Sequence, residues 1–434
     1  MADHAVTTPD TPRPVAGRDR LLSMDALRGF ALLGILGPNI LAFAWPWSAI
    51  ASAQGMADAA LIADPETPVL FDRANEISLW LIEVLFQGKF MFLFASLFGA
   101  GVVFFSRKFD AGGASRLSRG AGLWYTRMGV LLAIGFVHAF GLWFGDILVW
   151  YAFAGLAAVW WVRRWSPRTL FITGSLAYLF GTIVMLAITA LSDWAIQQGH
   201  MTEDQMGGVP LADDIAAYAN GTYLDQFVMR LMVLLPWYVI MPFTFLWQIT
   251  GLMMVGIGLT RTGVFTGARS NHFYATLAAF GITIGLILTV VVRSWLRGLD
   301  SPIASFYWMT VAQLVGSPLA LGYVGVVVLV AKSRALEFIA IPLAAVGRMA
   351  LTNYLLQTLI CTTIFYSYGG GLYATVQFPF LWAVVLSVWI VNIVFSMLWL
   401  SAFRFGPAEW AWRSLTYLRP QPLLKDAMLK TRGS

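Results

Sequence analysis

The sequence predicts an all-α fold, a polytopic transmembrane helical bundle of about 10 spans with both termini on the cytoplasmic side. Of its 434 residues, 59% are hydrophobic and only 12% are charged, whereas soluble domains carry about 25% charged residues. Apolar stretches of about 20 residues, long enough to cross a bilayer, recur along the chain. Because lipid offers no hydrogen-bond partners, these uninterrupted runs favour helices over barrel strands.

Ten apolar segments are candidate spans. The stretch 227–260 is too long for one straight helix and is interrupted by Pro236 and Pro242. We expect a single pass there and assign 213–235 partly to an interfacial helix, because two short passes would reverse every later loop. The candidate spans are 25–45, 78–105, 123–143, 146–163, 168–191, 237–260, 272–293, 304–331, 342–366 and 378–401.

Basic residues gather in alternate loops and in both tails, which predicts the orientation of the chain. The long loops 46–77 and 192–226 are acidic instead. By the positive-inside rule, the basic loops face the cytoplasm of a bacterial-type inner membrane. This topology accounts for the net charge of +6, so we expect no nucleic-acid partner. The basic loop residues are Arg107, Lys108, Arg116, Arg119, Arg163, Arg164, Arg168, Arg261, Arg269, Lys332 and Arg334.

Two terminal tails flank two transmembrane halves in the predicted organisation. The first 20 residues are rich in proline and charge, which indicates a disordered cytoplasmic tail. No repeat of 20–50 residues is visible, so a solenoid is not expected. The predicted parts are the tail 1–20, the N-terminal half 21–210, the C-terminal half 211–420 and the tail 421–434.

The cysteine and glycine residues bear on disulfide formation, metal binding and dimerisation. The single cysteine, Cys361, lies in an apolar segment, so no intramolecular disulfide can form. The chain lacks the Cys/His spacing of metal sites, and we expect no metal. A small-residue face with Gly251, Gly256 and Gly258 permits a homodimer but also suits ordinary internal packing.

Ionisable or amide side chains inside spans are candidates for function because burying them in lipid is costly. In the first span, Asp25 and Arg28 are three residues apart and can pair. This pair either caps the helix or leaves Arg28 facing an anionic ligand. Asn39 can bind substrate or join helices. Lys89, among aromatic residues in the second span, either contributes to a site or extends toward the interface.

The strongest local signal surrounds His138, near the end of the third span. A neutral imidazole exchanges protons near neutral pH, and a carboxylate can orient it. Asp146 is the expected partner because only a short turn separates the third and fourth spans, and Tyr151 follows within the same motif. The alternative is a core histidine bonded to a backbone carbonyl, with Asp146 capping the next helix.

The ninth span begins with an unusually polar segment on the predicted cytoplasmic side. Arg348 and Gln357 lie along neighbouring turns, with Asn353 between them. Together with Arg28 and Arg127, Arg348 would place three arginines at similar depth. Guanidinium groups bind phosphate bidentately, so this cluster suits phosphate or pyrophosphate. Each arginine can equally be an anchor of the positive-inside type.

These segments resemble the YeiB-like membrane proteins. The part from roughly residue 250 onward resembles the domain of unknown function that defines this family. The resemblance implies a shared fold from residue 20 to about 420 and rests on residues 23–35, on 89–101, on His138 with 145–148, on 347–354 and on 403–417.

The first-helix segment 23–35 also resembles the wider transmembrane acyltransferase superfamily, which includes heparan-α-glucosaminide N-acetyltransferase. This resemblance implies transfer of an acyl group from cytoplasmic acyl-CoA or acetyl-CoA across the membrane. It also implies that the arginine cluster, with Asn353, holds the coenzyme and that His138 is the general base. That enzyme carries its histidine near the end of the first-helix region, where this chain has Asn39.

We therefore expect a membrane-embedded acyltransferase. His138, oriented by Asp146, would deprotonate a small-molecule, glycan or lipid-linked acceptor at the outer side of the membrane. The alternatives are a transporter or flippase for a small anionic or lipid-linked molecule, favoured by the interrupted stretch 227–260, and a non-catalytic sensor or assembly partner. The expected substrate-binding residues are Asp25, Asn39, Lys89, Tyr151 and Gln357.

Overall fold

The structure is a computed structural model, and it confirms the all-α prediction. Apart from an isolated bridge between Phe403 and Leu424, every regular element in the described part of the chain is a helix. The predicted tail 1–20 and most of the tail 421–434 lie outside the described residues. The structure describes residues 22–51, 53–66, 73–110, 114–202, 209–301 and 303–425.

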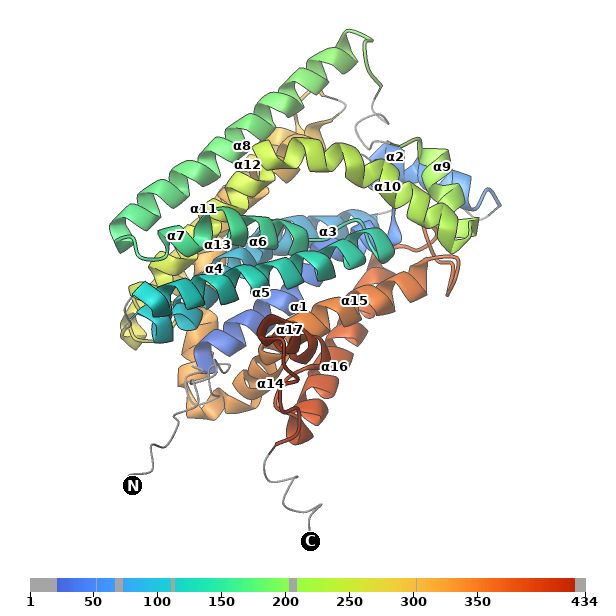
Figure 1. The fold of residues 1–434 in the computed structure, drawn as a ribbon. Coiled ribbons are helices and arrows are strands. Elements are labelled where there is room, and N and C mark those ends of the chain that lie inside the picture. The colour runs from blue at the N-terminus through green and yellow to red at the C-terminus, as the bar shows by residue number, and fades with distance from the viewer. Residues whose placement is uncertain are drawn as a thin grey trace, which may run out of the picture.

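The helices follow one another along the chain (Figure 1). The α-helices are α1 (Leu22–Ala44), α2 (Ala53–Ala63), α3 (Arg73–Leu81), α4 (Lys89–Asp110), α5 (Ala114–Gly141), α6 (Leu148–Ala154), α7 (Trp160–Val162), α8 (Pro167–Gln197), α9 (Leu211–Ile215), α10 (Tyr223–Ile240), α11 (Phe245–Arg261), α12 (Asn271–Arg297), α13 (Ala304–Lys332), α14 (Glu337–Arg348), α15 (Ala350–Phe365), α16 (Phe378–Ala402) and α17 (Pro407–Tyr417). Short π and 3-10 segments are η2 (Ala49–Ala51), η3 (Ile82–Phe86), η4 (Gly155–Val159), η6 (Ala216–Asn220), η7 (Met241–Phe243) and η8 (Arg334–Leu336).

Long apolar helices with apolar outer faces make this a multi-pass membrane protein. In the described part of the chain, eight helices are long and apolar enough to cross a bilayer, or nine if α14 and α15 form one span bent by 84°. On α8, the exposed side chains include Leu176 and Ile183, and on α12 they include Phe280 and Ile287. Such faces suit lipid, since a soluble fold rarely exposes them together.

Two of the ten predicted spans correspond to short helices in the structure. The candidate span 146–163 corresponds to α6 through α7, which together are shorter than a typical crossing, and 237–260 corresponds largely to α11, which has 17 residues. By contrast, α10 with η7, which overlaps the expected interfacial segment, is long enough to span. The break at η7 falls at Pro242, as the proline pattern indicates. The count of 10 and the orientation remain predictions.

Helix α1 lies inside the bundle, where it packs against α4, α13, α14 and α15 (Figure 1). Glycines allow α1 and α14 to touch backbone to backbone. A Cβ on Gly347 would lie 1.9 Å from the carbonyl oxygen of Asp25, and one on Gly29 would lie 1.8 Å from that of Leu343. This close approach brings the end of α14 beside the start of α1.

We expect Gly347→Ala to destabilise the protein. The added methyl group would collide with backbone, which cannot move aside as a flexible side chain does, and overpacking of this kind costs about 1–3 kcal/mol. Thermal unfolding in detergent measures the effect as a lower midpoint. Gly129→Ala is the matched control, because a Cβ at Gly129 meets nothing within 4 Å. Equal midpoints for the two variants would contradict the backbone contact.

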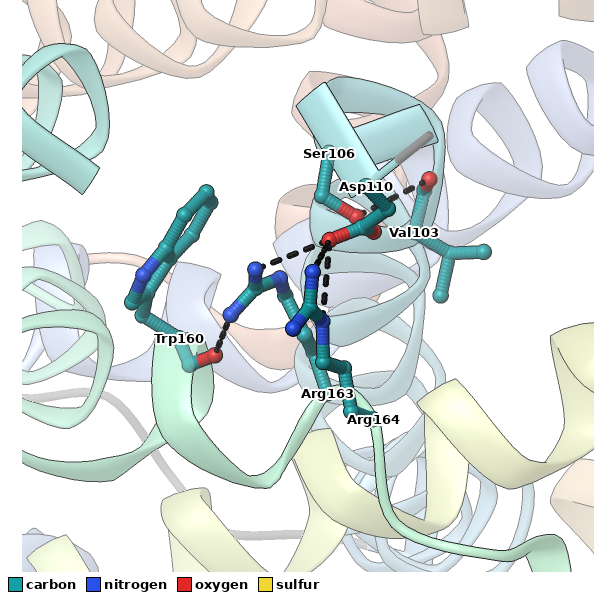
Figure 2. Close-up of polar contacts among 6 residues, drawn as sticks. All are labelled: Val103, Ser106, Asp110, Trp160, Arg163 and Arg164. Atoms are coloured by element: carbon teal, nitrogen blue, oxygen red, sulfur yellow. Dashed lines mark hydrogen bonds and ion pairs between the residues drawn. The ribbon is translucent and has the colours of Figure 1, made fainter. Parts of the chain in front are cut away.

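A shared carboxylate ties the end of α4 to the segment after α7 (Figure 2). An Asp110 oxygen accepts hydrogen bonds from Arg163 at 2.9 Å and from Nε and Nη2 of Arg164 at 3.1 and 3.0 Å. Arg163 also donates to the Trp160 carbonyl and stacks on its ring at 3.6 Å. Arg163 and Arg164, two of the basic residues assigned to a loop, thus also connect the end of α4 to the segment after α7.

The glycine face of α11 is used for packing inside the bundle. Gly251 lies against Tyr178 and Gly258 against Phe171, both on α8, while Gly256 meets the backbone of Ser96 on α4. Of the two alternatives for this face, internal packing therefore holds. A homodimer remains a prediction that needs another surface.

Candidate functional site

A cavity of about 240 Å³ opens between α1, α4, α5, α6 and the α14–α15 corner, with α17 beside it. The 84° bend between α14 and α15 occurs at Met349, so the backbone turns at the cavity wall. The residues that line the cavity are Met24, Asp25, Arg28, Phe94, Leu97, Phe98, Gly101, Phe104, Phe105, Trp124, Arg127, Met128, Leu131, Leu148, Tyr151, Gly347, Arg348, Ala350, Leu351, Tyr354, Glu409, Trp412, Arg413 and Tyr417.

The three arginines of the predicted anion site line this one cavity, although they come from distant parts of the chain. Arg28 pairs with Asp25 at 3.3 Å, which confirms the expected intrahelical pair, and its side chain keeps 25% of its exposure. The Arg127 guanidinium stacks on Trp412 at 3.7 Å. Arg348 ends α14 beside Gly347. The predicted clustering of these arginines is therefore confirmed.

Helix α17 adds charged residues that the sequence did not single out. Arg413 is a fourth arginine on the cavity wall, and Glu409 lies there too. The Glu409 carboxylate accepts the N–H groups of Leu351 and Thr352 at 2.6 and 3.1 Å, and the Thr352 hydroxyl at 2.6 Å. Burial raises the pKa of Glu409, and these hydrogen bonds act against that shift. Glu409 thus caps α15 and fixes α17 over the cavity.

A buried hydrogen-bonded row joins Asp146, His138 and Thr358. Nδ1 of His138 lies 2.7 Å from Oδ2 of Asp146, and Nε2 lies 2.9 Å from Oγ1 of Thr358. The other Asp146 oxygen accepts the N–H of Val149 at 2.8 Å, at the start of α6. The expected His138–Asp146 contact is confirmed. Asp146 also caps the next helix, while the imidazole bonds side chains rather than the backbone carbonyl of the alternative.

Tyr354 connects the cavity with this row. Its ring centroid lies 4.9 Å from that of His138, and Tyr354 also lines the cavity. Leu148, two residues after Asp146, lines the cavity as well. Neither His138 nor Asp146 is among the lining residues in the described part of the chain. The arginine-lined space therefore reaches the immediate neighbour of the histidine but not the histidine itself.

Tyr151 offers the cavity an unused polar group. Its side chain is fully buried and its ring lies against those of Phe94 and Phe98, with centroids at 5.8 and 5.2 Å. Its hydroxyl has no hydrogen-bond partner among the described residues. Because leaving a buried hydroxyl unpaired costs about 1–3 kcal/mol, such a group on a cavity wall suits a polar atom of a ligand.

Other predicted site residues lie away from the cavity lining. Asn353 is fully buried and donates to Val346 and to Ser396 at 3.2 and 2.7 Å, which joins α15 to α16. Gln357 donates to the Leu32 carbonyl at 3.3 Å and so holds α15 to α1. Asn39 is half-buried. Their roles in ligand binding remain predictions.

Lys89 also lies outside the cavity lining and inside the protein. It is 0% exposed, donates to the Glu83 carbonyl at 2.9 Å, and lies 5.5 Å from the centroid of the Trp308 ring. The alternative in which Lys89 extends to the interface is therefore wrong, since protein encloses its ammonium. The contribution of Lys89 to substrate binding remains a prediction.

Thr358 and the charged face of α17 were not predicted as site residues. Thr358 follows Gln357 in one of the polar pairs that interrupt the apolar residues of α15, so its polarity is visible in the sequence. Its partner, however, lies 220 residues away. Arg413 and Glu409 belong to a short helix with charged residues on one face, a signal typical of any surface helix.

The fold and this site define a multi-pass helical membrane protein with an arginine-lined cavity that ends beside a buried histidine–aspartate pair. The chain belongs to the YeiB-like family. It is 31% identical over 425 residues to the uncharacterized protein YeiB of Escherichia coli (strain K12), an alignment that covers 94% of this chain and 98% of the relative.

A second relative supports the same membership. The uncharacterized protein YxaH of Bacillus subtilis (strain 168) is 30% identical over 436 residues, across 95% of this chain and 98% of its own length. Residues 259–419 match the family described as a protein of unknown function, DUF418. This match confirms the resemblance expected from roughly residue 250 onward. No solved structure matches the chain significantly.

Proposed function

We propose that this protein is a membrane acyltransferase that moves an acyl group from acyl-CoA or acetyl-CoA to an acceptor at the opposite face of the membrane. The observation that carries the proposal is one cavity that joins Arg28, Arg127 and Arg348 to Tyr354, the neighbour of His138. In this proposal the arginine end faces the cytoplasm of a bacterial-type inner membrane, as the positive-inside rule favours.

The cavity wall has the chemistry of a donor that is anionic at one end and apolar further along. Guanidinium groups bind phosphates bidentately and keep their charge when partly buried. Among the described residues, four arginines line the wall together with two carboxylates, Asp25 and Glu409. Phe94 and Phe98 form an apolar wall that leads to the Tyr151 hydroxyl, which has no hydrogen-bond partner in the described part of the chain and suits a polar atom of the bound acyl thioester.

His138 supplies the general base. A carboxylate only accepts hydrogen bonds, so Asp146 holds the proton of a neutral His138 on Nδ1 and leaves Nε2 as the acceptor. Nε2 takes the proton of the incoming hydroxyl or amine, and Asp146 stabilises the imidazolium that results. The acceptor is proposed to be a small molecule, glycan or lipid-linked compound that presents such a group.

The test uses the full chain purified in detergent with radiolabelled acetyl-CoA. We expect saturable binding of acetyl-CoA, together with transfer of label to a hydroxyl or amine acceptor, for which octyl glucoside and glucosamine are the first probes. Binding is measured without acceptor, so it does not depend on the choice of acceptor. Absence of both binding and transfer would contradict the proposal.

A transporter or flippase is the second candidate, because broken helices often line transport sites. The 84° bend between α14 and α15 adjoins Arg348 on the cavity wall, and η7 breaks the path from α10 to α11. Proteoliposomes that enclose buffer, with radiolabelled acetyl-CoA outside, separate the two functions. Unmodified label that accumulates inside favours transport, whereas label found covalently on an acceptor favours acyl transfer.

A further inference from the structure

Thr358 completes a row that has the order of a nucleophile, a base and an orienting carboxylate. Asp146 fixes the neutral His138 with its proton on Nδ1, so Nε2 must accept. With this tautomer, the Thr358 hydroxyl, 2.9 Å from Nε2, is placed to donate to it. A hydroxyl that donates to an oriented imidazole is the arrangement that activates serine and threonine nucleophiles.

The contact of Thr358 with His138 is additional to the usual bond of a threonine within a helix. Threonines in helices commonly donate back to a carbonyl one turn earlier. In α15, Thr363 does so toward Leu359 at 2.7 Å and Thr362 toward the same carbonyl at 3.4 Å. The Thr358 hydroxyl is likewise within hydrogen-bond distance of the corresponding Tyr354 carbonyl, at 3.3 Å, but it lies closer to Nε2 of His138, at 2.9 Å. The shorter contact is the one with His138.

The position of Thr358 links it to the cavity. It lies one helical turn after Tyr354, so both side chains are on the same face of α15. Tyr354 is on the cavity wall and its ring lies beside His138, so Thr358 adjoins the residues at which the cavity ends. Thr358 itself is 1% exposed, which keeps water from a bound acyl group.

We propose that Thr358 is a catalytic nucleophile that carries the acyl group as an oxygen ester between donor and acceptor; this inference rests on the proposed acyltransferase function. Thr358 Oγ1 bonds to the acyl carbon as its proton passes to His138 Nε2. The carbon–sulfur bond breaks, and the coenzyme thiolate takes that proton to leave as a thiol. The acceptor then gives a proton to Nε2, bonds to the acyl carbon and releases Thr358, which recovers its proton.

An acyl-threonine intermediate separates the donor step of the reaction from the acceptor step. Direct transfer would require donor and acceptor to meet beside His138 at the same time. With the acyl group held on α15, the donor leaves before the acceptor approaches. We therefore expect ping-pong kinetics, in which donor and acceptor bind alternately.

The direct test is to incubate the full chain with radiolabelled acetyl-CoA in the absence of acceptor. We expect up to one labelled acetyl group per chain, found by mass spectrometry on Thr358. Cys361 lies three residues further on and is the neighbouring thiol. An ester on threonine resists neutral hydroxylamine, whereas a thioester on cysteine does not. Label on Cys361, or no label from protein that completes acyl transfer, overturns the proposal.

Substitutions separate a nucleophile from a positioning residue. Thr358→Val keeps the shape but removes the hydroxyl, so we expect no label and a turnover at least about a thousandfold lower. Thr358→Ser keeps a nucleophile and should still be labelled. Thr362→Val, in the same helix, should behave like the wild type. A Thr358→Val protein that folds and retains turnover contradicts the role of Thr358 as the nucleophile.

Failure of this proposal and failure of the acyltransferase function give different results. If the wild type transfers acetyl groups but never carries label, the proposal that Thr358 is the nucleophile is wrong and the acyltransferase function stands. If the wild type neither binds acetyl-CoA nor transfers its acetyl group, both proposals fail together. Melting curves for each variant show whether a loss of turnover reflects unfolding.

Discussion

Replacing His138 with alanine is expected to lower the rate of acyl transfer by about 100- to 10,000-fold, the range over which a positioned general base contributes. The loss should fall on kcat, because His138 is absent from the cavity lining in the described part of the chain and acts on the proton of the nucleophile. Turnover of radiolabelled acetyl-CoA by the purified variant measures the effect. Binding of acetyl-CoA to the variant should remain close to that of the wild type.

His272→Ala is the control for His138→Ala. His272 is exposed at the start of α12 and outside the site, so its loss should leave turnover unchanged. Asp146→Asn adds a second comparison, because an amide can hold the opposite tautomer and leave Nε2 protonated. We expect that variant to fold and to lose most of its turnover. Full activity in His138→Ala would exclude the histidine as the base.

Replacement of cavity arginines by glutamine should weaken binding of the donor. A hydrogen bond to a charged group contributes about 1.5–3 kcal/mol, so Arg28→Gln and Arg348→Gln should each raise the KM for acetyl-CoA by about 10- to 100-fold. Part of this loss should also appear in the wild type at high salt, because salt screens partly exposed charges. Initial rates at varied acetyl-CoA concentration give the KM.

The matched control for the arginine variants is Arg168→Gln. This change removes the same charge from an exposed position in the first turn of α8, away from the cavity. It should leave KM unchanged. If Arg28→Gln and Arg348→Gln had the same KM as Arg168→Gln and the wild type, the cavity would not be the site of the coenzyme phosphates.

The sequence predicts the membrane bundle and the arginine cluster because both depend on strong local signals. Apolar runs report spans, and arginines inside such runs are few enough to be compared by depth. His138 and Asp146 were predictable as partners because eight residues and a short turn separate them. The arginine cluster and the His138–Asp146 pair could therefore be predicted from the sequence.

The contacts of Thr358, Glu409 and Lys89 could not be predicted in the same way. Thr358 meets His138 across 220 residues, and Glu409 caps α15 across 58 residues. Contacts of this range depend on how helices pack, and packing depends on close approaches such as that of Gly347 to Asp25. Lys89 is enclosed by neighbouring helices that its own segment does not reveal.

An experimental density map of the protein with a non-hydrolysable acetyl-CoA analogue tests the central claim most directly. The account predicts phosphate density beside Arg28, Arg127 and Arg348, with the acyl end near Tyr151 and Tyr354. An analogue bound at saturating concentration anywhere else, with the arginine-lined cavity empty, would contradict it.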